Sequence, residues 1–430
     1  MNAARPHAAQ VSGLGVVCSI GHDVLQFGQS LAEGRCGVVR EPMPAPSWAE
    51  AKLHAPIAGF DFATALQPYA DHPGEFALRA LRLGRRASLP VQASITSAAQ
   101  AWTQARLHMG DVAEERIGLV IAGHNTTQSD AYRLYPDFQQ HPQHLSPRYA
   151  IQFMDSNHLG VLSEAFSIRG EGFVAGGASA SGNVGLLQGL RMIEAGVADV
   201  CLVCAVAAEL SPMEHRAFHA IGALGGKAFA DRPGEACRPF DSQHEGFVPG
   251  QASVCVVLES QASAEARGAQ ALATLLGGAM ALHATSTSEP DMAGEARVMH
   301  AALQRAGLSP GDVDYLNTHG SSSPLGDEVE LQAIQQVFGD HFPRLWLNAT
   351  KGLAGHCLQA AALLEAVAIV VQMQRGCVHP NRNLERPIHA AARFSGSAPV
   401  DHRIRIAASN AFGFSGIDTC VVFANVAGGL

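Results

Sequence analysis

Two stretches of the chain repeat one pattern, and this repeat restricts the fold more than any other feature. GGASASGNVGLLQGLRMIEAG at residues 176–196 and KGLAGHCLQAAALLEAVAIVVQMQRG at residues 351–376 are both Gly-rich turns that feed a helix of Ala, Gly and Leu ending at Gly. Helices that are apolar on every side are usually buried. The repeat predicts a duplicated α/β unit with two central helices packed between sheets. The pattern alone also allows two unrelated Ala-rich helices.

Strand-like runs alternate with helical segments along the whole chain. Examples are RIGLVIAG, ADVCLVCAVAAEL, ASVCVVLES, ATLLGGAMALHA and RIAASNAFGFSGIDTCVVFANV. Such alternation favours an α/β protein with a mostly parallel, buried sheet. We expect an N-terminal half at residues 1–260 and a C-terminal half at residues 261–430, joined in one compact body. A less regular, Pro-rich segment at about residues 40–90 is predicted to be a cap or insertion.

Charge and hydropathy exclude two kinds of partner. The formal net charge of −9 argues against nucleic acid, because binding its backbone needs a clustered excess of Lys and Arg. No run reaches the roughly 20 apolar residues that cross a bilayer, and the start MNAARPHAAQ lacks the apolar segment of a secretory signal. We therefore expect a cytoplasmic protein that does not bind membranes.

The nine cysteines lie mostly in apolar, strand-like runs such as VCLVCAV and SVCVVLE. An odd number scattered in this way predicts reduced core residues rather than a disulfide framework. Cys201 and Cys204 form a CxxC, but no second pair of ligands accompanies it. We expect no metal site.

Ser179 occupies the first Gly-rich turn, where a hydroxyl could act as a nucleophile. The preceding glycines permit a sharp turn, and the following helix would place free backbone N–H groups and a positive dipole end near the hydroxyl. A serine at a helix start is also a common N-cap, and this second interpretation remains open here.

Two histidines lie beside similar turns. His319 follows the strand-like run YLNT, at the carboxyl end where α/β sheets bind their ligands, and His356 lies in the second Gly-rich turn, five residues after Lys351. Near the C-terminus, Phe412 and Phe414 alternate with glycines before the last strand-like run. These phenylalanines could line or gate an apolar site, or simply be core residues at a turn.

Together these segments resemble the β-ketoacyl synthases, condensing enzymes of the thiolase fold that act on thioesters of acyl carrier protein (ACP). The resemblance covers nearly the whole chain. The motifs that carry it are ASASG at residues 178–182, RPFDSQHEGFVPGQAS at 238–253, THGSSSPLGD at 318–327, TKGLAGH at 350–356 and SNAFGFSG at 409–416.

The resemblance implies a five-layer αβαβα body built from two thiolase-like halves, and a homodimer. It implies that His319 and His356 are the catalytic histidines, that Lys351 is a supporting buried lysine, and that Glu365 is its acidic partner. It further implies that Phe414 gates the site, with Phe412 beside it. The backbone N–H groups of residues 179 and 414 would form the oxyanion hole.

One departure from the family bears on function. Condensing enzymes have Cys at the position of Ser179, because a thiolate at a helix N-terminus is nucleophilic near neutral pH and a hydroxyl is not. Loss of CO2 from a malonyl thioester needs no covalent intermediate, only stabilisation of the enolate oxygen. The sequence, including SPMEHRAFHAIGALGGK at residues 211–227, resembles the malonyl-ACP decarboxylases of polyketide β-branching cassettes, which make acetyl-ACP.

Such an enzyme would need no cofactor besides the phosphopantetheine that carries the substrate on ACP. Three alternatives stay open: a condensing enzyme whose Cys was replaced by Ser through engineering, a non-catalytic subunit similar to chain-length factors, and acyl transfer or hydrolysis through a true Ser nucleophile.

Smaller departures concern the shape of the pocket and the docking of a carrier. Ser321, Ser322 and Ser323 replace a Thr-Gly-Thr, Ile417 and Asp418 replace a Thr-Asn, and Gln359 stands where glycine is common. These changes are expected to affect a tunnel for an acyl chain more than the histidines. A further hypothesis is that the neighbouring arginines bind an acidic carrier protein, and these are Arg79, Arg82, Arg85 and Arg86.

Overall fold

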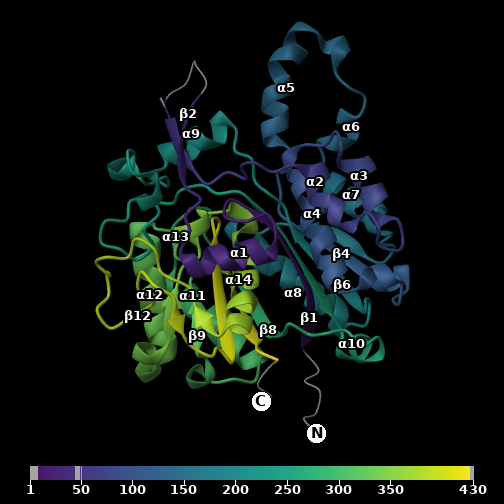
Figure 1. Ribbon diagram of the computed structural model, residues 1–430. Coiled ribbons are helices and arrows are strands. Elements are labelled where there is room, and N and C mark those ends of the chain that lie inside the picture. Colours follow the sequence, from purple (N-terminus) through teal and green to yellow (C-terminus); the bar gives the residue numbers. More distant parts are fainter. Residues whose placement is uncertain (1–7, 44–48, 50, 427–430) are drawn as a thin grey trace.

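The computed structural model describes residues 8–43, 49 and 51–426. Residues 1–7 and 427–430 of the two expected halves, and residues 44–48 and 50 of the expected cap, lie outside the described residues. An 11-stranded sheet crosses the molecule in the order β12-β10-β9-β14-β15-β8-β1-β7-β6-β4-β5 (Figure 1). Within the described part of the chain, no helix is long and apolar enough to cross a membrane.

Ten of the eleven strands form two five-stranded halves with the same topology, and the short strand β12 pairs with β10 at one edge. The first contains β1 (Ala9–Cys18), β4 (Ile117–Ala122), β5 (Gly172–Ala175), β6 (Val200–Ala205) and β7 (Ala252–Glu259). The second contains β8 (Ala273–Leu282), β9 (Tyr315–Asn317), β10 (Trp346–Asn348), β14 (Ile406–Gly413) and β15 (Ile417–Ala424). Each half reads third, second, fourth, fifth and first strand across the sheet, and antiparallel pairing of β1 with β8 joins them. The division of the chain near residue 260 stays a prediction, which this repeat supports.

The expectation of a mostly parallel sheet is wrong, because each half is mixed. The strands β4, β5 and β6 are parallel, as are β9, β10 and β14. By contrast, β7 is antiparallel to β6 and β1, and β15 is antiparallel to β14 and β8. The physical reason is clearest at the C-terminus, where the Gly-rich turn after Gly413 closes a β14–β15 hairpin instead of feeding a helix.

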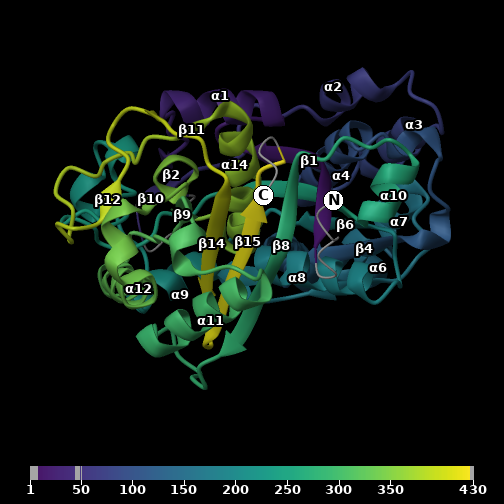
Figure 2. The ribbon, with the colours of Figure 1, turned by 90° about the horizontal axis from the view of Figure 1, so that it is seen from below.

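Helices complete five layers, as predicted. The central layer is α8 (Ser181–Glu194) with α14 (Ala361–Arg375), and its core includes side chains from both half-sheets. One outer layer contains α4 (Leu89–Gln104) and α7 (Ser156–Phe166), and the other contains α11 (Met292–Arg305) and α12 (Pro324–Phe338). Figure 2 shows this arrangement from below. The α8–α14 crossing requires Gly182, because a Cβ there would lie 2.2 Å from the backbone nitrogen of Leu363.

Short elements connect and flank these layers. Part of the segment expected to be a cap is an antiparallel pair of strands, the exposed β2 and the half-buried β3, whereas α2 and α3 pack with α4 and α7 in the outer layer. The remaining elements are α1 (Val24–Glu33), β2 (Val39–Pro42), β3 (Ala51–His54), α2 (Phe62–Leu66), α3 (Phe76–Gly84), α5 (Gln128–Gln140), α6 (Tyr149–Gln152), α9 (Pro212–Ala220), α10 (Gln261–Ala266), α13 (Lys351–Ala354), β11 (Cys377–Val378), β12 (Arg393–Phe394) and β13 (Val400–Asp401).

Candidate active site

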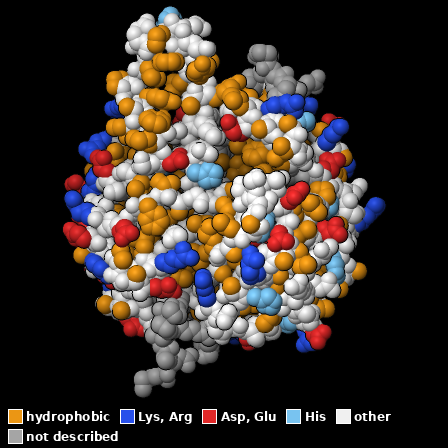
Figure 3. All heavy atoms as spheres, turned by 180° about the vertical axis from the view of Figure 1, so that it is seen from behind, with side chains coloured by type: hydrophobic (Ala, Val, Ile, Leu, Met, Phe, Trp, Pro, Cys, Tyr) orange, Lys and Arg blue, Asp and Glu red, His pale blue; other side chains and the backbone are white. Residues whose placement is uncertain are grey.

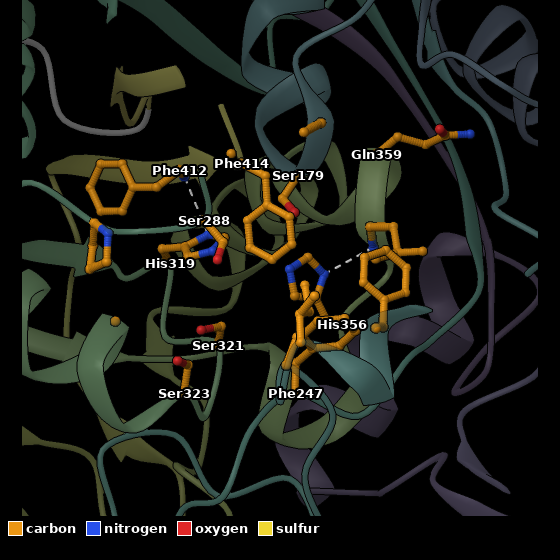
Figure 4. Close-up of a pocket in the computed structure, with 18 of the residues that line it drawn as sticks. Ser179, Phe247, Ser288, His319, Ser321, Ser323, His356, Gln359, Phe412 and Phe414 are labelled. Atoms are coloured by element: carbon orange, nitrogen blue, oxygen red, sulfur yellow. Dashed lines mark hydrogen bonds between the residues drawn. The ribbon is translucent and has the colours of Figure 1, made fainter. Parts of the chain in front are cut away.

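A cavity of about 460 Å³ lies where the two halves meet, and both halves contribute to its wall. Residues far apart in the sequence line it together, namely Ser179, His319, His356, Phe412 and Phe414. Figure 4 shows the serine and the two histidines around one space. The structure therefore brings these five candidate residues into one site.

Ser179 lies in a one-turn helix, η5 (Ala178–Ala180), directly before α8. Ala178 has a φ of 47°, which forces the chain into a sharp turn there. The neighbouring Ser181 hydroxyl stabilises the turn, since it accepts from the Gly177 N–H (2.9 Å) and donates to the Ala178 carbonyl (2.7 Å). The N-cap positions of η5 and α8 are Gly177 and Ala180, and neither has a side-chain capping bond, so Ser179 is not an N-cap. The Ser179 hydroxyl has no hydrogen-bonding partner among the described residues.

Hydrogen bonds fix both the backbone and the ring of His356. Its N–H donates to the Val248 carbonyl (2.7 Å), and its carbonyl accepts from the Gly250 N–H (2.8 Å). The Leu358 N–H donates to the ring nitrogen Nδ1 of His356 (3.0 Å). An Nδ1 that accepts a hydrogen bond carries no proton, so the ring proton is on Nε2. His356 is therefore an N–H donor at Nε2.

His319 has the same tautomer for a different reason. The Phe412 N–H donates to its Nδ1 (3.4 Å), and the Lys351 ammonium lies 3.5 Å from the same atom. Both groups are donors, which again leaves the ring proton on Nε2. The two imidazole rings are 5.6 Å apart between centroids and nearly perpendicular, at 80°. Two N–H donors thus lie side by side in the cavity.

Lys351 and Glu365 lie behind the histidines and are not part of the cavity wall. The lysine Nζ donates to Glu365 Oε1 (2.6 Å) and to the His319 carbonyl (2.5 Å). Both side chains are almost fully buried. Burial raises the pKa of Glu365 to about 7, which the adjacent ammonium opposes. The Lys351 ammonium thus lies next to His319 without lining the cavity, and Glu365 holds it there.

This charge and the burial keep both histidines neutral. Burial lowers the pKa of His319 well below its ordinary value, and the Lys351 ammonium and His356 lower it further. Burial and Lys351 likewise lower the pKa of His356 well below that value. At neutral pH both rings are uncharged donors, the state that can stabilise a developing oxyanion.

Phe412 contacts His319, whereas Phe414 lies at the tip of a hairpin and is partly exposed. The Phe412 backbone orients His319, and its ring lies 5.6 Å from the His319 ring. Phe414 is at the tip of the β14–β15 hairpin with 38% of its surface exposed. This hairpin reaches the serine turn only because residue 413 is Gly, since a Cβ there would lie 2.6 Å from the Gly177 carbonyl oxygen. Among the described residues, neither the Ser179 N–H nor the Phe414 N–H has a partner.

The sequence interpretation missed Glu330, which positions His319. Its carboxylate accepts from the N–H groups of His319 (2.7 Å) and Gly320 (2.8 Å) and from the Asn410 amide (3.2 Å). Burial raises the pKa of Glu330 to about 7, and these hydrogen bonds oppose the rise. The available signal was an acidic residue among apolar ones on the buried face of α12, three positions after Asp327.

Several of the resemblance motifs build the frame of the site. Asp327 accepts from the N–H groups of Phe240 (2.7 Å) and Ser322 (3.1 Å), and so joins two of the motifs. Arg238 and Asp241 form a fully buried ion pair of 3.1 Å. Asp241 also accepts from the backbone N–H groups of Glu385 (2.8 Å) and Arg386 (2.7 Å), and buried hydrogen-bonded carboxylates of this kind fix loop geometry. These residues hold the loop after His319 against the rest of the site.

One part of the cavity wall contains acidic groups, and among these the sequence analysis named only Asp418. Glu295 is 1% exposed, its Oε2 has no partner, and burial raises its pKa well above the ordinary value. The carboxyl oxygen Oδ2 of Asp418 is hydrogen-bonded to Nδ1 of His283 (2.9 Å). Glu289 and Ser288 belong to the same part of the wall. This part of the wall is polar and carries buried carboxyl groups.

The arginine hypothesis receives limited support. The Arg79 side chain already binds other parts of this chain, since it donates to the carbonyls of Ala165 (3.2 Å) and Gly74 (2.8 Å). Arg82 pairs with Glu164 at 2.8 Å, while Arg85 and Arg86 are exposed. Helix α3, which carries the first two, contributes nothing to the cavity wall. Docking of a carrier at these arginines stays a prediction.

The cysteines are free thiols, and most are buried. Cys201 and Cys204 lie in the interior of β6. The described residues include no group of three or more His, Cys, Asp or Glu side chains placed to hold a metal ion.

The chain matches two sequence families that together cover most of its length. Residues 9–264 match the family described as "Beta-ketoacyl synthase, N-terminal domain", and residues 272–385 match "Beta-ketoacyl synthase, C-terminal domain". The Bacillus subtilis (strain 168) protein named polyketide biosynthesis malonyl-ACP decarboxylase PksF is 33% identical over 97% of this chain and 96% of its own length. The 3-oxoacyl-[acyl-carrier-protein] synthase 2 of Coxiella burnetii is 29% identical over 97% of this chain and 98% of its own length.

Solved structures show the same architecture. A β-ketoacyl synthase from Burkholderia phymatum STM815 superposes with a TM-score of 0.83 at 26% identity, covering 98% of this chain and 100% of that one. A structure described as a type II PKS acyl-carrier protein in complex with its ketosynthase gives a TM-score of 0.84 at 25% identity, covering 98% of this chain and 100% of that chain. With its five layers and duplicated halves of the thiolase fold, this chain belongs to the β-ketoacyl synthase family.

Proposed function

We propose that this protein removes CO2 from a malonyl group carried as a thioester on ACP, and so produces acetyl-ACP. The observation that carries the proposal is the pair of neutral Nε2–H donors, His319 and His356, in a cavity whose turn presents Ser179 instead of a thiol. The Bacillus subtilis relative is named for the same activity. We further propose that the acetyl-ACP is used in polyketide β-branching, and that the protein works in the cytoplasm.

In this reaction the bond between the carboxylate carbon and C2 of the malonyl group breaks, and CO2 leaves. The electron pair of that bond moves into the thioester and places negative charge on its oxygen, forming an enolate. The Nε2–H groups of His319 and His356 would donate to this oxygen. A proton then adds to C2 and gives the acetyl thioester. Preorganised donors in a site that excludes water stabilise such charge strongly.

Ser179 fits this reaction better than condensation. A condensing enzyme must first take up an acyl chain on its nucleophile, and a serine hydroxyl needs a base to do so. The Ser179 hydroxyl has no partner among the described residues, so no base is aimed at it. The free N–H of the same turn can still bind a carbonyl oxygen. Retention of both histidines also argues against a silent subunit.

The partner implied by this proposal is an acyl carrier protein. A ketosynthase of the same fold has been solved in complex with one. The carrier's phosphopantetheine would bring the thioester into the cavity, and the proposed reaction uses no other cofactor.

The direct test is to incubate the protein with malonyl-ACP and follow the acyl group by mass spectrometry. We expect conversion to acetyl-ACP well above the uncatalysed background, with no covalent adduct on the protein. The absence of acetyl-ACP would overturn the proposal. An acyl group found on the protein would indicate a condensing or transferring enzyme instead.

Replacing Ser179 by Ala tests the role assigned to its hydroxyl. A neutral hydrogen bond is worth about 0.5–1.5 kcal/mol, so loss of the hydroxyl should lower the rate of decarboxylation by no more than about tenfold. The measurement is the steady-state rate of acetyl-ACP formation. A loss of about a hundredfold or more would contradict this minor role, and a covalent acyl group on Ser179 would identify it as a nucleophile.

We also propose a homodimer, assembled through the arm formed by residues 128–154. This arm, with α5 and α6, rises from the body in Figure 1, and apolar side chains cover much of it in Figure 3. Tyr135 (58% exposed), Phe138 (42%) and Ile151 (62%) are among these side chains. An exposed apolar patch of this kind usually marks an interface between proteins.

The double variant Tyr135→Glu/Phe138→Glu should therefore be a monomer, because it places two charges in the apolar interface. Light scattering after size exclusion would give half the molecular mass of the unmodified protein. Leu78→Glu is the matched control, since Leu78 is also exposed (60%) but lies on α3, away from the arm. A monomeric unmodified protein, or a double variant of unchanged mass, would contradict this interface.

A further inference from the structure

We propose that Gln359 sets an upper limit on the length of the acyl group that the cavity accepts, so that only short groups such as malonyl and acetyl fit. This inference rests on the proposed function, because it assigns the acyl specificity of the same site. Gln359 lines the cavity together with Ser179, and only 6% of it is exposed. Figure 4 shows its side chain extended away from the two histidines.

The side chain of Gln359 forms a bridge between two strands at their carboxyl ends. Its Oε1 accepts from the His124 N–H (3.4 Å), just past the end of β4. Its Nε2 donates to the Val206 carbonyl (3.2 Å), just past the end of β6. The amide therefore satisfies two backbone groups that would otherwise need water or a ligand. A group held at both ends in this way does not move aside easily.

Packing also keeps the Gln359 side chain in place. Residue 123 must be Gly, because its φ is 150° and a Cβ there would lie 3.0 Å from the Gln359 Cδ. The backbone of the β4–α5 connection thus packs directly on the glutamine side chain. An acyl chain that extends in this direction would have to displace the side chain and break both of its hydrogen bonds.

A second part of the cavity wall is unsuited to contact with an acyl chain for a chemical reason. It includes the buried carboxyl of Glu295, whose Oε2 lacks a partner, and the His283–Asp418 pair. Methylene groups packed against this wall would offer the partnerless Glu295 Oε2 no hydrogen bond, whereas a polar ligand could supply one. Gln359 therefore blocks an acyl chain in one direction, and the polar wall at Glu295 disfavours an acyl chain in the other.

The experiment measures direct binding of acyl pantetheine analogues in which an amide replaces the thioester, so that no turnover is needed. Calorimetry would compare acetyl, butyryl and hexanoyl analogues with the unmodified protein and with Gln359→Gly. We expect the hexanoyl analogue to bind the unmodified protein at least tenfold more weakly than the acetyl analogue. In Gln359→Gly, hexanoyl binding should strengthen at least tenfold, whereas acetyl binding should change less than threefold.

Gln359→Ala is the second variant, for use if the glycine variant does not fold, and the same direction of change is expected. Gln336→Ala is the matched control, because Gln336 is an exposed glutamine on α12 that does not line the cavity, and it should behave as the unmodified protein does. Equal binding of hexanoyl and acetyl analogues by the unmodified protein, or no gain in either Gln359 variant, would overturn the inference. A protein that shows the gain but does not convert malonyl-ACP would instead disprove the proposed function alone.

Discussion

Replacing His319 by Ala is expected to lower the rate of malonyl-ACP decarboxylation by about 100-fold or more, with no loss of the fold. Removal of one preorganised oxyanion donor costs roughly 3–4 kcal/mol of transition-state stabilisation. His319 is such a donor because the Phe412 N–H and Lys351 fix its proton on Nε2. His356→Ala should have an effect of similar size, since the Leu358 N–H fixes the same tautomer there. The measurement is the rate of acetyl-ACP formation under saturating substrate.

Two further variants make this result specific to the donor. His319→Gln keeps an N–H group near the position of Nε2, so it should recover part of the rate that His319→Ala loses. His300→Ala is the control for loss of an imidazole, because His300 is exposed on α11 and lies outside the cavity wall. A His319→Ala variant with more than a tenth of the original rate would contradict the proposed role. So would a His319→Gln variant that is no faster than His319→Ala.

The arrangement of Ser179 and the two histidines could be anticipated from the sequence because each lies in a locally defined turn. A Gly-rich segment before an apolar helix determines its own geometry, and duplicated segments imply helices that pack together. The tautomers could not be anticipated. The tautomer of each histidine depends on which N–H group donates to its Nδ1. The donor to His319 is Phe412, which lies 93 positions away in the chain.

Local sequence patterns could not predict the direction of the strands or the polarity of the cavity wall. An apolar run has the same appearance in a parallel and in an antiparallel strand, so β7 and β15 gave no sign of their direction. The buried carboxyl of Glu295 resembles an ordinary acid in the first turn of a helix, which is common on protein surfaces. Only the packing of α11 against β8 and β15 buries it.

Burial and the positive charge of Lys351 together keep both histidines neutral, and removal of this charge leads to the second large effect. Lys351→Met alone leaves Glu365 buried without its partner, and breaking such a pair typically costs about 3–5 kcal/mol of folding stability. The double variant Lys351→Met/Glu365→Gln removes both charges together and should retain a higher melting temperature than the single variant. Glu365→Gln is its matched control, because the amide oxygen still accepts from Lys351 and the ammonium charge remains.

The pH profile of kcat/KM should separate these variants. Lys351 lowers the pKa of His319 and of His356, so its removal raises both pKa values toward the ordinary 6.5. Protonation of either ring places a second proton on Nδ1, facing the N–H group that now donates to it, and the ring loses its orientation. An imidazolium would also stabilise the malonyl carboxylate before CO2 leaves. As pH falls, activity should therefore be lost at a higher pH in Lys351→Met/Glu365→Gln than in Glu365→Gln, by about one pH unit or more. Coincident acidic limbs would show that burial alone, without the lysine charge, keeps the two histidines neutral.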